Sequence, residues 1–84
     1  MNKIEIQPHA NQRAIERGAT EAEIIRTTTD GELFPAKFGR TGARMNFSFD
    51  SEWNGVHYKM KQIECFFVDE ANKRIVITVI VKYY

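Results

Sequence analysis

Hydrophobic and polar residues follow two different spacings along this chain. In the first third, apolar residues recur at helical spacing within two short segments, residues 8–17 and 21–28. Pro8 suits the first position of a helix, where its missing N–H has no intrahelical partner. Thr20 and Glu23 have the spacing of a capping box, in which each side chain bonds the backbone N–H of the other. The pattern therefore predicts two short helices.

After the second helical segment the period changes to two, which is typical of strands. The predicted strands cover residues 32–38, 43–50, 56–68 and 74–83, and residues 3–6 form a short leading strand. Pro35 cannot donate to a ladder and indicates an edge strand. The apolar phase slips within the third of these strands, which predicts a bulge near Lys61-Gln62. The last strand is β-branched on both faces, which indicates a central strand covered from both sides.

This order predicts an α+β fold in one domain, residues 1–84. The simplest arrangement is a four-stranded antiparallel meander with both helices packed on one face, because short helices need a sheet to dock on. The chain of 84 residues is too short for two independent cores or for a separate cofactor domain.

Composition excludes several classes of function. With 12 Lys and Arg against 11 Asp and Glu, the net charge of +1 is far from that of a strongly basic nucleic-acid binder. The single cysteine, Cys65, permits no internal disulfide, which suits the cytoplasm. No Cys/His spacing resembles a metal site, the N-terminus has no apolar h-region of a signal peptide, and the longest apolar stretch, Ile75 to Val81, is too short to span a membrane. We therefore expect a cytoplasmic protein with no metal and no small-molecule cofactor.

The first candidate site is a row of cationic residues on the first predicted helix. His9, Arg13 and Arg17 are spaced four residues apart, so a helix places them along one side. Guanidinium groups match phosphate oxygens, and a histidine can move a proton near neutral pH. The alternative is that both arginines are solvated and pair with Glu16 and Glu21.

The second candidate site lies on the strands. Alternation places His57, Lys59 and Lys61 on one face, where Arg44 of the neighbouring strand can join them. Next to aromatic residues such as Tyr83, this basic stripe suits RNA, which is held by phosphate contact and base stacking. The alternative is a solvent-facing strand with ordinary charges.

Thr78 interrupts the apolar run from Ile75 to Val81. Its hydroxyl needs a hydrogen-bond partner if it is buried. Either it reflects strand propensity alone, or it lines a site at the centre of the sheet.

The segment from His9 to Ile24 carries the pattern H-x-x-x-R-x-x-x-R-G and resembles the opening of a small bacterial domain family of unknown function. The final strand of that family is similar to Val76–Val79 here. The family is in turn similar to ribonuclease toxins of the BrnT and RelE types. The resemblance implies two helices on a curved antiparallel four-stranded sheet and cleavage of RNA without a metal.

The resemblance also implies a mechanism, in which the ribose 2′-hydroxyl attacks the adjacent phosphate. His9 is assigned the proton transfer, Arg13 and Arg17 clamp the phosphate, and Thr78 lies on a motif position. The pattern of the chain adds Lys59, Lys61 and Lys82 as contacts to the RNA backbone and Tyr83 as a stacking platform.

The implied partners are RNA and an antitoxin protein that holds the nuclease inactive. Two alternatives remain open: a module that binds RNA without cleaving it, and a non-enzymatic module that binds a protein. The protein-binding module would use the helix row or a sheet edge, bordered by Pro35 and by the C-terminal residues 82–84.

Overall fold

A computed structural model describes residues 3–84 as an α+β fold. The chain order is β1 (Lys3–Ile6), α1 (Pro8–Glu16), α2 (Glu21–Asp30), β2 (Glu32–Pro35), β3 (Thr41–Trp53), β4 (Val56–Glu70) and β5 (Lys73–Tyr83). Both predicted helices form, and the capping box between Thr20 and Glu23 is present with both of its hydrogen bonds. The described residues include no helix that is long and apolar enough to cross a membrane.

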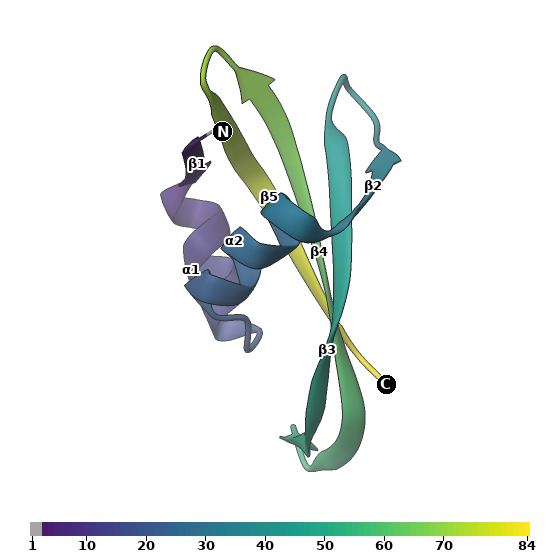
Figure 1. The fold of residues 1–84 in the computed structure, drawn as a ribbon. Coiled ribbons are helices and arrows are strands. Elements are labelled where there is room, and N and C mark those ends of the chain that lie inside the picture. The colour runs from purple at the N-terminus through teal and green to yellow at the C-terminus, as the bar shows by residue number, and fades with distance from the viewer. Residues whose placement is uncertain (1–2) are drawn as a thin grey trace.

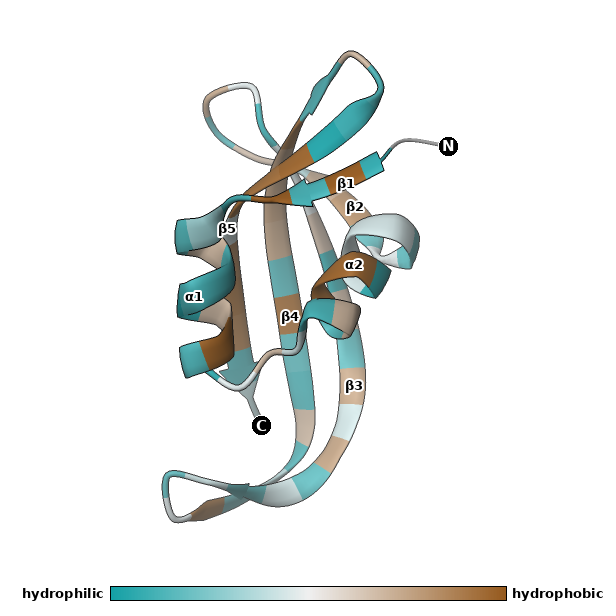
Figure 2. Ribbon diagram, turned by 90° about the vertical axis from the view of Figure 1, so that its left-hand side faces the viewer, coloured by the Kyte–Doolittle hydropathy of each residue, from teal (hydrophilic) through white to brown (hydrophobic). Residues whose placement is uncertain are grey.

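The five strands form one sheet in the order β1-β5-β4-β3-β2 (Figure 1). The four later strands are antiparallel neighbours, as the meander predicts. The leading strand β1 joins as a fifth strand and runs parallel to β5, which the sequence pattern did not indicate. Both helices lie on the same face of the sheet, with α1 beside β5 and α2 over β3 and β4 (Figure 2).

The expectation that β5 is covered on both sides is wrong. Helices cover one face only, and β1 pairs with β5 only along Lys73–Val76. Strand propensity explains the β-branched residues elsewhere on β5, because these side chains suit a pleated, half-buried surface without a second covering layer.

The bulge expected near Lys61-Gln62 is also absent from its predicted place. The register between β3 and β4 runs uninterrupted from Thr41 to Ser48, and the irregularities lie at residues 48–51 and at Phe66/Phe67. The apolar phase slips for another reason. Lys61 takes a buried, core-facing position of the odd-numbered series, so a polar residue occupies a position that the pattern expects to be apolar.

Strand β2 ends at Pro35 rather than at residue 38. Phe38 has a φ of 61° and Gly39 a φ of 71°, and these left-handed conformations turn the chain into β3. The second helix in turn continues two residues beyond its predicted end, to Asp30. Its three threonines, Thr27–Thr29, each donate their hydroxyl hydrogen to the carbonyl four residues earlier, so these polar groups are satisfied within the helix.

The core lies between the helices and the sheet. Its buried members are Ala14, Ala19, Ile24, Ala43, Ile63, Cys65, Phe67, Val76 and Val79. The small side chains of Ala10 and Ala14 on α1 allow that helix to lie close to β5. Burial raises the pKa of the Cys65 thiol to about 11, despite a hydrogen bond with Thr28 that favours ionisation. This thiol is therefore an inert packing group at neutral pH.

A separate aromatic cluster supports the distal end of the long β3–β4 hairpin, which turns at Asn54-Gly55. The rings of three residues on the hairpin contact the ring of Tyr83, and we call these four residues the aromatic cluster: Phe49, Trp53, Tyr58 and Tyr83. Trp53 stacks on Tyr83 with ring centroids 4.9 Å apart. The hairpin extends well beyond the helices (Figure 1), and this cluster fixes it to the end of β5.

Candidate functional site: a cationic pocket between α1 and β5

A pocket of about 180 Å³ lies between α1 and β5. We call it the α1–β5 pocket, and it is lined by His9, Ala10, Arg13, Arg17, Ile77, Thr78 and Val79. The four residues on motif positions, which the sequence predicts to form the catalytic site, thus lie around one pocket. The motif places three of them on the helix and the fourth more than sixty positions later in the chain.

Local structure explains the position of the helical row. The backbone N–H of Gln7 donates to the Val76 carbonyl, so α1 starts directly beside β5. Ala10 and Ala14 face the sheet and are 3% and 0% exposed. The four-residue spacing then directs His9, Arg13 and Arg17 along the side of the helix that borders β5.

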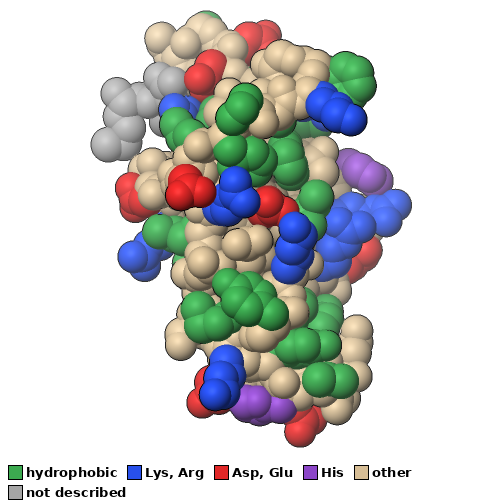
Figure 3. All heavy atoms as spheres, turned by 90° about the vertical axis from the view of Figure 1, so that its right-hand side faces the viewer, with side chains coloured by type: hydrophobic (Ala, Val, Ile, Leu, Met, Phe, Trp, Pro, Cys, Tyr) green, Lys and Arg blue, Asp and Glu red, His purple; other side chains and the backbone are tan. Residues whose placement is uncertain are grey.

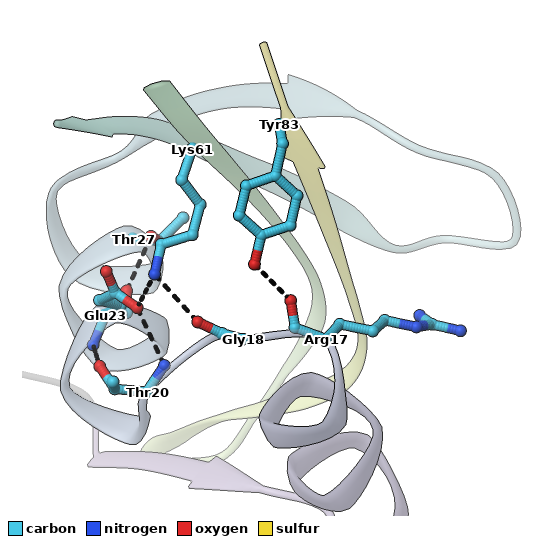
Figure 4. Close-up of polar contacts among 7 residues, drawn as sticks. All are labelled: Arg17, Gly18, Thr20, Glu23, Thr27, Lys61 and Tyr83. Carbon is cyan, nitrogen blue, oxygen red and sulfur yellow. Dashed lines mark hydrogen bonds and ion pairs between the residues drawn. The ribbon is translucent and has the colours of Figure 1, made fainter. Parts of the chain in front are cut away.

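Arg17 is held at both its backbone and its side chain. Its guanidinium donates to the Val79 carbonyl at 3.3 Å, and its own carbonyl accepts a hydrogen bond from the Tyr83 hydroxyl at 2.6 Å. Figure 4 shows the carbonyl directed toward Tyr83 while the guanidinium extends away from it. These contacts fix the last cation of the row at the β5 side of the pocket.

The basic side chains of the α1–β5 pocket lack acidic partners within the described part of the chain. Among residues 3–84, no carboxylate forms an ion pair with His9, Arg13 or Arg17. Glu16, which was a possible partner, instead accepts a hydrogen bond from Gln12 at 3.5 Å. The pocket therefore carries positive charge that is not neutralised by the described part of the chain.

Thr78 occupies a different place from the one expected. It pairs with Phe66 of β4 and lies just past the point where β1 ends, beside the open margin of the sheet rather than at its centre. From there it lines the pocket together with Ile77 and Val79.

The basic stripe expected on the strands does not form as a solvent-facing surface. Lys61 is 6% exposed, and its ammonium group donates to Glu23 Oε1 and to the Gly18 carbonyl, both at 2.9 Å (Figure 4). Lys61 therefore joins β4 to the turn between the helices. The same carboxylate oxygen also accepts the Thr20 N–H of the capping box.

Most of the other basic residues predicted as an RNA site on the strands form an ion pair with a carboxylate. Arg44 pairs with Glu32 at 3.3 Å, and its guanidinium carbon lies 4.3 Å from the centre of the Phe34 ring. The remaining pairs are His57 with Asp50 and Lys82 with Glu64, each at 3.1 Å. Lys59 is the exposed member for which no ion pair forms within residues 3–84.

Tyr83 is engaged as well. Trp53 stacks on its ring, and its hydroxyl bonds the Arg17 carbonyl, so the ring lies inside the aromatic cluster rather than open to a base. Partial burial, together with the nearby negative charge of Glu23, raises the pKa of this phenol.

Sequence reasoning missed the Lys61–Glu23 pair. A signal was present, because Lys61 falls on the core-facing parity of β4 next to Ile63 and Cys65. A lysine at such a position requires a carboxylate partner. The capping-box glutamate fits that requirement, but the pairing of segments 38 positions apart is not visible in the sequence.

Residues 3–84 contain no group of three or more His, Cys, Asp or Glu side chains placed to hold a metal ion. Comparison with protein-family models, with curated proteins and with solved structures finds no match for this chain. The resemblance to ribonuclease toxins therefore stays a prediction from the motif. What the geometry itself provides is a small pocket suited to an anion.

Proposed function

We propose that the chain binds a phosphodiester of RNA in the α1–β5 pocket and cleaves it by attack of the ribose 2′-hydroxyl. One observation carries the proposal: His9, Arg13, Arg17 and Thr78 line a single pocket in which the cations have no acidic partner within the described chain. Guanidinium groups donate several hydrogen bonds in a planar fork that matches phosphate oxygens.

The pocket suits one phosphate group rather than a long nucleic-acid surface. Its volume of about 180 Å³ is small, and the neutralised strand cations add little attraction around it. Figure 3, which views the helix-free side of the sheet, shows cationic side chains and a histidine gathered at one margin. Contacts of Arg44, His57, Lys59 and Lys82 with RNA stay predictions.

The proposed reaction needs two proton transfers and charge stabilisation. His9 accepts the proton of the 2′-hydroxyl as its oxygen attacks phosphorus, and the bond to the 5′-oxygen breaks. Water from the open mouth of the pocket protonates the leaving 5′-oxygen. Arg13 and Arg17 stabilise the charge that develops on the non-bridging oxygens. The products are a 2′,3′-cyclic phosphate and a free 5′-hydroxyl.

Cleavage of a labelled single-stranded RNA in EDTA tests the proposal. The wild-type chain is compared with His9→Ala, Arg13→Ala and the matched control Lys37→Ala, an exposed lysine outside both candidate sites, all purified identically and checked for folding by circular dichroism. We expect His9→Ala to lower the rate by about 10²–10⁴-fold, the usual contribution of a positioned proton-transfer group, while Lys37→Ala stays within about threefold.

Mass spectrometry of the products provides the second readout, since a 2′,3′-cyclic phosphate is the expected end. Equal cleavage by wild type and His9→Ala would show a contaminating nuclease and contradict the proposal. Intact RNA with a folded wild-type chain would also contradict cleavage. If that RNA is nevertheless retained in an Arg13-dependent way, the pocket belongs to a non-catalytic RNA-binding module.

A further inference from the structure

The sheet has an open margin along the second half of β5. β1 pairs with β5 only through Lys73–Val76, and beyond that point no strand of residues 3–84 lies on that side. Figure 1 shows β5 continuing to the C-terminus well past β1. An unpaired strand edge of this kind presents backbone donors and acceptors to any extended chain.

Hydrogen bonds already present identify which groups face outward. Tyr84 exchanges both of its backbone hydrogen bonds with Met60 of β4, so its N–H and C=O point into the sheet. Successive residues of a strand alternate in this direction, so the groups of Tyr83, Val81 and Val79 point to the open margin. The Arg17 contact with the Val79 carbonyl agrees with this assignment.

The chemistry beside this margin is cationic. The α1–β5 pocket, with His9, Arg13 and Arg17, is lined on its strand side by Ile77–Val79, where the open margin begins. Arg17 itself occupies one edge carbonyl, that of Val79, and the Tyr83 hydroxyl meets the Arg17 carbonyl at the end of α1, whereas within residues 3–84 no hydrogen bond uses the outward backbone groups of Val81. A strand added here would therefore run from the aromatic cluster toward a pair of arginines.

We propose that Val79–Tyr83 of β5 is a docking edge for an extended segment of another protein, with an acidic side chain of that segment seated against Arg13 and Arg17. Backbone pairing supplies the affinity, as in other complexes formed by strand addition, and the carboxylate fixes the register. The edge does not depend on catalysis. Where the pocket also binds RNA, the acidic side chain competes with the phosphate for the same arginines.

Charge complementarity distinguishes this partner from a second copy of the chain. Two copies joined edge to edge would bring the cations of both α1–β5 pockets against one seam, and neither pocket has a carboxylate partner within residues 3–84. Like charges facing each other disfavour such a dimer. An acidic segment instead supplies the missing countercharge.

A synthetic peptide tests the docking edge directly. The probe is a fluorescein-labelled, end-blocked peptide of alternating threonine and valine with one central glutamate, titrated with the full chain by fluorescence polarisation. We expect saturable binding that weakens about tenfold or more when the glutamate is replaced by glutamine. The same weakening is expected with Arg13→Ala but not with the control Lys37→Ala, an exposed lysine outside both candidate sites.

Two peptides methylated on alternate backbone nitrogens separate strand pairing from simple charge attraction. In an added strand, every second N–H faces β5, so one methylation pattern should abolish binding and the other should leave it. Binding that survives both patterns, or no binding at all, overturns the proposal. This readout uses the wild-type protein and is independent of RNA cleavage.

A variant of the edge completes the test. In Val81→Pro, the outward N–H is lost without removing a β4–β5 hydrogen bond, and proline is tolerated at such an edge position. We expect a folded chain, by circular dichroism, that binds the peptide about tenfold more weakly. Sedimentation provides the competing outcome: a concentration-dependent dimer that Val81→Pro abolishes would assign the edge to a second copy and overturn the acidic partner.

Discussion

The protein has two groups of cationic residues, and they differ in what surrounds them. On α1 and at its C-cap, His9, Arg13 and Arg17 line one pocket and meet no carboxylate within residues 3–84. On the strands, Arg44, His57, Lys61 and Lys82 each have an acidic partner. The first group keeps side chains that can meet an anion, whereas most side chains of the second group are paired with carboxylates within the fold.

The difference has a simple origin. Residues four apart on a helix are neighbours whatever the rest of the chain does, so the α1 row is set locally. Strand alternation fixes only which face a side chain takes. Whether that face meets a carboxylate depends on distant segments, such as Glu23 of α2 for Lys61.

The largest expected effect concerns Lys61. In Lys61→Met, the apolar stem is retained and the ammonium is removed, so the Gly18 carbonyl and part of the Glu23 carboxylate lose their donor. We expect the free energy of unfolding to fall by about 2–4 kcal/mol, because a partly buried charge is left unpaired. Urea denaturation measures it. The matched exposed variant Lys59→Met should change stability by less than about 0.5 kcal/mol, and equal effects would contradict the comparison.

Inorganic phosphate sharpens the contrast between the two groups. We take phosphate to bind the α1–β5 pocket with a dissociation constant of about 1 mM. At about 50 mM phosphate, we then expect the free energy of unfolding to be roughly 2 kcal/mol higher than in chloride of equal ionic strength. We expect this increment to disappear in Arg13→Ala and Arg17→Ala and to persist in Lys59→Ala and Arg44→Ala. Thermal or urea unfolding measures the increment. Loss of the increment in Arg44→Ala, or its persistence in Arg13→Ala, would place the anion outside the α1–β5 pocket.

The smallest expected effect connects the aromatic cluster to the pocket. In Tyr83→Phe, the ring stacking remains and the hydrogen bond to the Arg17 carbonyl is lost, at a cost of about 0.5–1.5 kcal/mol. The pKa of Tyr83 is raised above its ordinary value of 10.0, so the fold favours the neutral phenol. The stability from this preference is full below the unfolded pKa and is lost as the pH rises through the folded pKa.

Unfolding of Tyr83→Phe and wild type in parallel from neutral to alkaline pH checks that sign. We expect the difference between the two proteins to narrow as the pH rises past 10, the ordinary value for tyrosine. A difference that stays constant would show that the phenol is not favoured in its neutral form by the fold.

Local signals predicted most of the elements. Pro8 starts α1, and the capping box starts α2 at Glu21. The Asn54-Gly55 turn joins two long strands as expected, because both residues accept a positive φ. The errors fall where distant groups decide. The pattern predicted a bulge beside Lys61 because a polar residue interrupts the apolar series of the strand. In the fold Lys61 is nevertheless buried, and its ammonium group donates to Glu23 and to the Gly18 carbonyl.

The candidate site was predictable to the same extent. The helical row and the motif position of Thr78 were visible in the sequence, and the structure places all four side chains around one pocket. The fate of the residues predicted on the strands could not be read from the sequence, because the Tyr83 ring stacks on Trp53 and the Lys61 ammonium pairs with Glu23. Alternation gives no information about such non-local partners.

By itself, the sequence determined two helices, four strands with a period of two, and the row of His9, Arg13 and Arg17 along α1 and its C-cap, because helical and strand periodicity and capping act within a few residues. The sequence also indicated a short leading strand at residues 3–6, but only the tertiary structure decided that this strand pairs in parallel with β5, along Lys73–Val76. Within residues 3–84, that pairing leaves the second half of β5 without a strand partner on the side of Arg13 and Arg17. The physical reason is that strand pairing, ion pairs and open edges depend on which distant segments meet, and only the packed chain brings those segments together.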